Sequence, residues 1–144
     1  MIVADTNVIL RGLRSNKGAS GYILKAMLTE DVALAATPAV MLEYDDVLKR
    51  PSSFEGFGIG AREVNTILDA LAMMARETYP RFRFRPFLDD PKDDLFIECA
   101  LAAGARVIVT DDRHFMHPDV AAFGITPRTA SDFVRELRMG RTST

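Results

Sequence analysis

Hydrophobic residues along the chain fall into two patterns, short apolar runs and longer segments with helical spacing. The apolar runs, which suit β-strands, lie at 1–4, 32–37 and 106–110. The segments with helical spacing lie at about 21–30, 38–49, 61–78 and 95–103. The run at 106–110 is apolar on both faces, which predicts a central position in a parallel sheet. Strands that alternate with helices predict a three-layer α/β/α domain with a mainly parallel sheet.

Capping residues and helix breakers indicate where one of these helices begins and ends. Thr37 is a suitable N-cap, and Pro38 then occupies the first helical position. The residue before a proline disfavours helical backbone, so this helix should stop before Pro51. The glycine-punctuated stretch 53–60 that follows predicts a loop.

Strands and helices are also expected to alternate in the second half of the chain. A buried helix should open at Asp93 and Asp94 and end at Gly104, because glycine favours the backbone of a helix C-terminus. The other expected elements are an edge strand at 81–87, a last strand at 124–126, a last helix at about 127–138 and a frayed tail at 140–144. We therefore expect one domain over residues 1–139.

Composition narrows the class of protein. The 144 residues suit one domain, and 48% hydrophobic with 26% charged residues is ordinary for a soluble globular protein and argues against disorder. No stretch has the roughly 18–20 apolar residues of a membrane span, and the N-terminus does not resemble a signal peptide. The single cysteine, Cys99, favours a reducing, cytoplasmic environment.

The net charge of -2 leaves a nucleic-acid partner open, because the two signs gather in different places. Acidic residues gather at 89–94 and 111–112. Arginines gather elsewhere, at positions 11 and 14, at 81, 83 and 85, and at 135, 138 and 141. Such a chain can combine an acidic pocket with basic surface.

Two aspartates follow the most apolar strands. Asp5 comes directly after the first strand, and Asp112 comes just after the strand at 106–110. In open α/β sheets the site lies at the carboxyl ends of the strands, so neighbouring strands would bring both carboxylates into one crevice. Each aspartate alone also has an ordinary explanation as a turn or capping residue.

Asp94 and Glu43 add two further acids. Asp94 lies at a predicted helix start, where a carboxylate also favours the helix dipole, but capping does not account for the four aspartates within 89–94. Glu43 borders the apolar face of its helix, while Asp45 and Asp46 turn towards solvent. A carboxylate at such a boundary usually has a partner, and a salt bridge to an arginine is the alternative to a metal.

Clustered carboxylates favour a hard divalent cation, because Mg²⁺ and Mn²⁺ prefer oxygen ligands. The sequence offers no alternative chemistry. His114, His117 and Cys99 do not form a zinc pattern, and the chain has no phosphate-binding glycine loop and no recognisable nucleophile motif.

Four segments together resemble PIN-domain proteins, and more narrowly the VapC ribonucleases, which are toxins of toxin–antitoxin pairs. The segments read ADTNVIL, LEYDDVLKRP, DPKDDLFIECALAAGA and VIVTDD, in the family's order and spacing. The resemblance covers nearly the whole chain. It implies a five-stranded parallel sheet of order 3-2-1-4-5 and cleavage of single-stranded RNA with Mg²⁺ or Mn²⁺. It also implies a homodimer and a cognate antitoxin protein.

The resemblance also assigns roles. The catalytic acids fall on Asp5, Glu43, Asp94 and Asp112, and the metal ligands among them are Asp5, Asp94 and Asp112. The supporting polar residues fall on Thr6, Asn7 and Thr110. Neighbouring acids leave Asp93 as an alternative to Asp94, and Asp111 as an alternative to Asp112.

The implied mechanism is metal-assisted hydrolysis of a phosphodiester, with Glu43 binding a second metal or orienting the attacking water. Arg11, Arg14 and Arg113 are candidates for contact with the RNA backbone, although each also suits an ordinary solvated face. The rival class is a PIN-fold module that binds RNA or protein without cutting it. A response-regulator-like or dehalogenase-like site fits poorly, because Asp5 is followed by Thr-Asn rather than by further acids.

Overall fold

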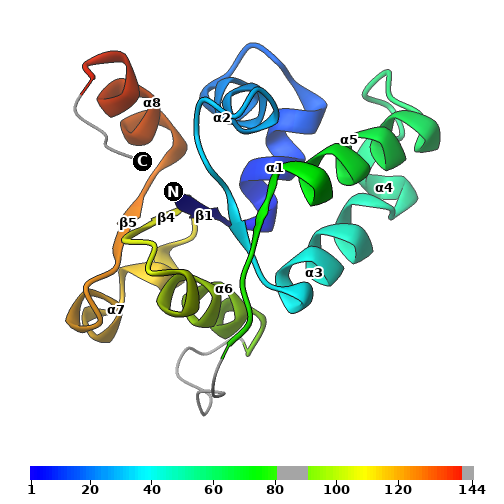
Figure 1. Ribbon diagram of the computed structural model, residues 1–144. Coiled ribbons are helices and arrows are strands. Elements are labelled where there is room, and N and C mark those ends of the chain that lie inside the picture. Colours follow the sequence, from blue (N-terminus) through cyan, green and yellow to red (C-terminus); the bar gives the residue numbers. More distant parts are fainter. Residues whose placement is uncertain (81–90, 141–144) are drawn as a thin grey trace.

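The computed structural model describes residues 1–80 and 91–140 (Figure 1). Its strands are β1 (Ile2–Ala4), β2 (Ala35–Ala36), β3 (Arg76–Glu77), β4 (Val107–Val109) and β5 (Thr126–Arg128). Its helices are α1 (Thr6–Arg14), α2 (Ala19–Leu28), α3 (Pro38–Leu48), α4 (Pro51–Phe54), α5 (Ala61–Met74), α6 (Pro91–Ala103), α7 (Pro118–Ala122), α8 (Ala130–Arg138) and the 3₁₀ helix η1 (Arg113–Met116).

The strands pair in parallel in two small sheets. One sheet has the order β1-β4-β5, and the other pairs β2 with β3. A single parallel bridge between Ile2 and Leu34 joins them. The α/β class, the parallel pairing and the central position of β4 are confirmed. The expected single five-stranded sheet of order 3-2-1-4-5 is not confirmed, because the described strands pair in two sheets.

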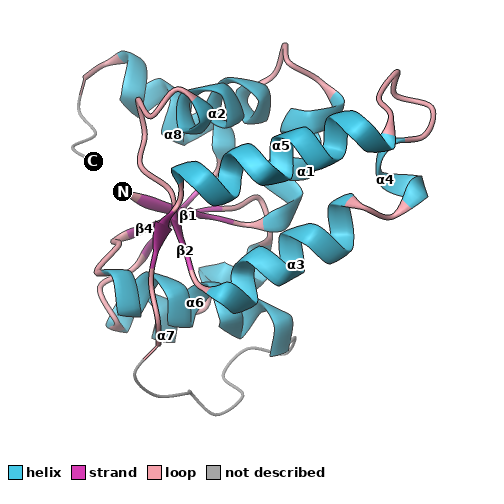
Figure 2. Ribbon diagram, turned by 45° about the vertical axis from the view of Figure 1, so that its right-hand side comes forward, coloured by secondary structure: helices cyan, strands magenta, loops and turns pink. Residues whose placement is uncertain are grey.

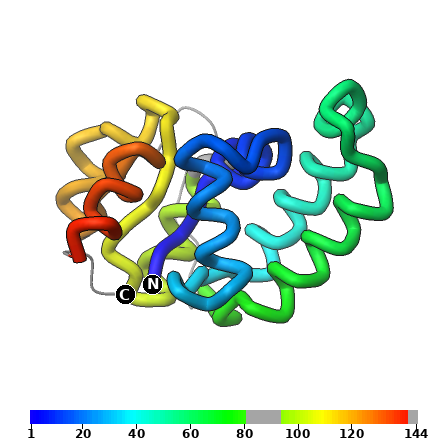
Figure 3. The backbone as a smooth tube through the Cα atoms, turned by 90° about the horizontal axis from the view of Figure 1, so that it is seen from above, coloured from blue at the N-terminus to red at the C-terminus, as the bar shows by residue number. Residues whose placement is uncertain are grey.

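Helices lie on both sides of the strands, with α6 and α7 on one side and α2 and α8 on the other (Figure 2). Helix α6 contacts β1, β2 and β4, and its residues Phe96, Cys99 and Ala100 are buried. Seen from above, α8 lies beside α2, while α3 and α5 lie together at the far end of the molecule (Figure 3). The buried strands and α6 thus form the centre of one hydrophobic core.

Three of the predicted helix ends are confirmed. The Thr37 side chain accepts a hydrogen bond from the Val40 N–H, and α3 ends before Pro51 as expected. Gly104 directly follows α6 and has a φ of +69°, a conformation that a side chain disfavours. These helix ends depend on interactions between residues close together in the chain, so a short stretch of sequence is enough to predict them.

Long-range strand pairing moves other boundaries. Helix α5 ends at Met74 rather than 78, because β3 pairs with β2. Helix α8 begins at Ala130 rather than 127, because residues 126–128 pair with β4 as strand β5, slightly later than the expected 124–126. Helix α6 begins at Pro91, two residues before the predicted start. The edge strand expected at 81–87 lies outside the described residues.

Four helical segments were not expected: α1 and the shorter segments α4, η1 and α7. Pro51 and Pro118 occupy the first turns of α4 and α7, where proline costs no hydrogen bond. Helix α4 therefore replaces the beginning of the loop expected at 53–60. Among the described helices, none combines the length and the apolar character that a membrane span needs.

Glycines bring α1 and α2 into close contact. A Cβ atom on Gly12 would lie 2.7 Å from the Ser20 carbonyl oxygen, and one on Gly21 would lie 2.5 Å from the Ser15 carbonyl oxygen. Neither position can hold a larger side chain without a backbone shift. The two helices therefore form a tight hairpin that fixes the connecting segment at 15–18.

Candidate active site

The parallel pairing of β1 with β4 brings Asp5 and Asp112 to the same edge of the sheet. Ala4 pairs with Val109, and the Asp5 N–H donates to the Val109 carbonyl at 2.9 Å. Both aspartates follow the carboxyl ends of their strands. The expectation that these two strands are neighbours is therefore confirmed.

Thr110 connects the two aspartates. Its hydroxyl donates to Asp5 Oδ2 at 2.9 Å and accepts from the Asp112 N–H at 3.0 Å. The Thr110 side chain is fully buried, and its bond to Asp5 is shielded from bulk water, whereas its bond from the Asp112 N–H is part-buried. One hydroxyl thus orients the Asp5 carboxylate and fixes the turn that carries Asp112.

Asp5 is a buried carboxylate beside another carboxylate. It is 5% exposed. Burial raises the pKa of Asp5 above its ordinary value of 3.8, and the Asp112 carboxylate adds to this rise. The hydrogen bond from Thr110 and the N–H groups of Thr6 and Asn7 act in the opposite direction. Asp5 occupies the N-cap position of α1, and these N–H groups belong to the first two residues of that helix, so the capping explanation for Asp5 is present beside the functional one.

Thr6 and Asn7 begin helix α1 directly after Asp5. Asn7 is exposed, whereas Thr6 is 5% exposed. Within the described part of the chain, the Thr6 hydroxyl is buried and has no hydrogen-bond partner. A buried hydroxyl without a partner is costly, and this one lies next to the candidate catalytic aspartate.

Helix α3 places Glu43 at the boundary of the core, half-buried as expected, next to the fully buried Tyr44. The Tyr44 hydroxyl donates to the carbonyl oxygen of Ala4, the residue before Asp5. Burial raises the pKa of this hydroxyl well above its ordinary value of 10.0, so it remains a donor. Tyr44 therefore holds α3 against the end of β1. No local sequence pattern indicates this contact, which joins residues 40 positions apart.

Cys99 lies on α6 and is buried near Tyr44. Burial raises the pKa of the Cys99 thiol to about 11. The thiol stays protonated at neutral pH, so Cys99 is a packing residue rather than a nucleophile.

Asp94 lies in the first turn of α6 rather than at its N-cap, and it is 6% exposed. The side chain of Asp93 lies outside the described residues. Of these two acids, the structure therefore describes only the side chain of Asp94, which is buried.

Asp111 and Asp112 have different surroundings. Asp111 forms a salt bridge of 2.6 Å with Arg11 and accepts from the Ala130 N–H at 3.3 Å, so it ties α1 to the start of α8. Asp112 lies close enough to Asp5 for its charge to raise the pKa of Asp5, and it also caps η1 by accepting from the His114 N–H at 2.9 Å. The capping explanation for Asp112 is therefore present beside the functional one.

Two of the three arginines near the acids interact with other parts of the protein. Arg11 pairs with Asp111, and Arg14 donates to the carbonyl oxygens of Ser52 and Ser53. Arg113 is exposed in η1.

A family model described as a PIN domain matches residues 1–114, which is most of the chain and includes all four candidate acids. The chain belongs to the PIN-domain family. No curated protein and no solved structure matches this PIN domain. The matched region ends before β5 and α8.

Among the described side chains, those of residues 1–80 and 94–140, no three or more Asp, Glu, His or Cys lie together in a way that could hold a metal ion, so no preformed metal centre is visible there. The donor types present do suit Mg²⁺ or Mn²⁺, because Asp5, Asp112 and the unsatisfied Thr6 hydroxyl all offer oxygen atoms. A cation would also offset the repulsion between Asp5 and Asp112.

Proposed function

We propose that this PIN domain is a metal-dependent endoribonuclease that hydrolyses phosphodiester bonds in single-stranded RNA. The observation that carries the proposal is the buried Asp5 carboxylate at the sheet edge, oriented by Thr110 and with its pKa raised in part by the nearby charge of Asp112. Buried carboxylates with raised pKa values cluster at functional sites. Membership of a family of nucleases supports the same conclusion.

In this proposal Asp5, Asp94 and Asp112 hold Mg²⁺ or Mn²⁺, and the Thr6 hydroxyl supports the site. When bound, such a cation lowers the pKa of a coordinated water and offsets the charge that develops on the phosphate. Glu43, half-buried on α3, orients the attacking water or contributes to a second metal. Thr110 keeps one Asp5 oxygen fixed through its hydrogen bond, which leaves the other oxygen to act as a ligand.

The biological role follows from the resemblance to VapC ribonucleases. We propose a cytoplasmic toxin of a type II toxin–antitoxin pair, which forms a homodimer and is inhibited by its cognate antitoxin. A continuous sheet of order 3-2-1-4-5, with the Ile2–Leu34 bridge at its centre, belongs to the same proposal.

The test is cleavage of a labelled single-stranded RNA with Mg²⁺ or Mn²⁺. We expect cleavage to stop on chelation and to be lost in Asp5→Asn, which keeps the size of the side chain but removes its charge. Asp69→Asn is the matched control, because Asp69 is exposed on α5. Circular dichroism checks that both variants fold. RNA cleavage that survives in Asp5→Asn, or that ignores chelation, would refute the mechanism.

The lack of a three-residue metal cluster among the described side chains favours one alternative, a PIN module that binds RNA or protein without cutting it. Calorimetric titration with Mn²⁺ separates the two functions. The nuclease should bind the cation, and Asp5→Asn should not. Cation binding in neither protein, together with tight RNA binding, would support the alternative.

A further inference from the structure

A pocket lies between α2 and α8, and none of the four candidate acids lines it. Its volume is about 610 Å³, and its walls come from the segment before α2, from α2 itself and from α8. Four cationic residues line it, Lys17, Lys25, Arg135 and Arg138, and no aspartate or glutamate does. In a chain of net charge -2, this is a local concentration of positive charge.

Three of these cations lack a carboxylate partner. Arg135 pairs with Asp132 at 3.2 Å, but Lys17, Lys25 and Arg138 form no salt bridge within the portion of the chain that the structure describes. Like charges on one small surface repel each other, and an anion that binds there would relieve the repulsion. The pocket is therefore suited to a polyanion.

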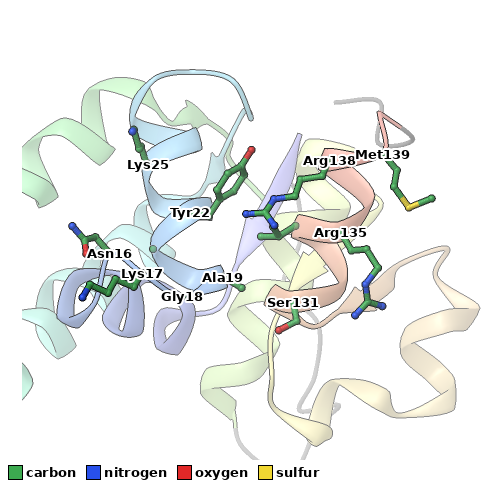
Figure 4. Close-up of a pocket in the computed structure, with 12 residues that line it drawn as sticks. Asn16, Lys17, Gly18, Ala19, Tyr22, Lys25, Ser131, Arg135, Arg138 and Met139 are labelled. Carbon is green, nitrogen blue, oxygen red and sulfur yellow. The ribbon is translucent and has the colours of Figure 1, made fainter.

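Tyr22 orients Arg138 within this pocket. The two side chains point towards one another from α2 and α8 (Figure 4), with the guanidinium carbon 5.2 Å from the ring centroid. A guanidinium that stacks on a ring still has N–H donors at its edge, in the planar arrangement that matches phosphate oxygens. Ser131 adds an exposed hydroxyl to the same pocket.

The pocket borders the candidate active site through the start of α8. Ser131 lines the pocket, and the N–H of its neighbour Ala130 donates to Asp111, which directly precedes Asp112. Helix α8 follows β5, which is parallel to β4, so α8 starts at the sheet edge where β4 leads into Asp112. An RNA strand that leaves the acids at this edge can continue onto the cationic pocket.

We infer that the α2–α8 pocket binds the sugar-phosphate backbone of single-stranded RNA on one side of the cleavage point. This inference rests on the proposed nuclease function and adds a second RNA contact beyond the acidic site. One wall of the pocket, α8, lies after residue 114, outside the part of the chain that matches the PIN-domain model. The contact is electrostatic, so it does not select a base sequence.

The test measures RNA affinity without cleavage. A fluorescein-labelled single-stranded RNA is titrated with the full-length protein in EDTA, and binding is followed by anisotropy over a range of salt concentrations. We expect the double variant Lys17→Ala/Arg138→Ala to weaken binding by about tenfold or more, and to reduce the salt slope by about 1.4 for two lost phosphate contacts. The matched control, Lys49→Ala/Arg50→Ala, removes the same charge from exposed residues that pair with Asp45 and Asp46 on α3. It should bind RNA as the wild type does.

Equal affinities and salt slopes for the wild type and the pocket variant would overturn the inference. An acidic peptide that binds the wild type but not the pocket variant, while both bind RNA equally, would also overturn it and would assign the pocket to a protein partner. Cleavage and binding are separate readouts here. Wild-type protein that binds RNA through the pocket but never cleaves it would refute the nuclease proposal and leave the pocket in place.

Discussion

Replacing Thr110 with valine tests the centre of the candidate site. Valine has nearly the shape of threonine, but it lacks the hydroxyl that donates to Asp5 and accepts from the Asp112 N–H. Because the bond to Asp5 is buried, water cannot readily replace the hydroxyl there, whereas the Asp112 N–H is only part-buried. The substitution therefore removes two hydrogen bonds without changing the packing much.

The size of the effect follows from the two bonds. A hydrogen bond to a charged group contributes about 1.5–3 kcal/mol and one between neutral groups about 0.5–1.5 kcal/mol, so we expect a loss of about 2–4 kcal/mol. Each kcal/mol lowers the melting temperature of a chain of this size by about 2–4 °C. Thr110→Ser is the matched control, since it keeps the hydroxyl and loses one buried methyl group, at a cost of about 1 kcal/mol.

The loss should also depend on pH. The Thr110 hydrogen bond holds the pKa of Asp5 down, so its removal raises the folded-state pKa of Asp5 further above 3.8. An acid with a raised folded-state pKa destabilises the fold as pH rises through the window between the unfolded and folded pKa values. The loss of stability in Thr110→Val, relative to the wild type, should therefore be larger near pH 8 than at about pH 4.5.

Urea unfolding of the wild type and both variants at the two pH values measures these differences. At the higher pH, we expect the free energy of unfolding of Thr110→Val to be well below that of Thr110→Ser. At the lower pH, the two values should be closer. Equal stabilities of the two variants at both pH values would show that the hydroxyl does not hold Asp5, and the reasoning would be wrong.

Three further predictions concern single residues. Gly21→Ala should lower the melting temperature by several degrees, because its Cβ would meet backbone atoms at 2.5 Å, whereas Gly18→Ala has open space and should change it little. Tyr44→Phe should cost about 1 kcal/mol in urea unfolding and lower RNA cleavage, because it removes the hydrogen bond to Ala4 beside Asp5; full stability and full activity would contradict this. Cys99 should resist thiol-modifying reagents in the folded protein and react after denaturation, as a thiol titration checks; rapid labelling of the native chain would contradict its burial.

Pattern and spacing predicted much of the frame for local physical reasons. A strand buried on both faces must be apolar throughout, so β1 and β4 were recognisable from their composition. The N-cap at Thr37 and the helix end at Gly104 depend on hydrogen bonds and backbone angles within a few residues. Asp5 directly follows the apolar run of β1, so its place at a strand end could be predicted in the same way.

The candidate site was predictable only in part, because its contacts join distant segments. The bond between Thr110 and Asp5 spans 105 residues, and the salt bridge between Arg11 and Asp111 spans 100. Hydrophobic periodicity indicates which face of a segment is buried, but it does not indicate which other segment packs against that face. Residue types alone could not show that Asp111 pairs with Arg11 while the neighbouring Asp112 lies close enough to Asp5 to raise its pKa.

By itself, the amino-acid sequence determined the α/β class, the buried strands and several helix ends, and it named the candidate acids of the site. Only the tertiary structure decided that the described strands pair in two sheets, that Thr110 joins Asp5 to Asp112, and that α2 and α8 enclose a cationic pocket. The physical reason is the range of the interactions. Caps and periodicity act over a few residues, whereas strand pairing, the orientation of a buried carboxylate and the gathering of charge depend on how remote segments pack.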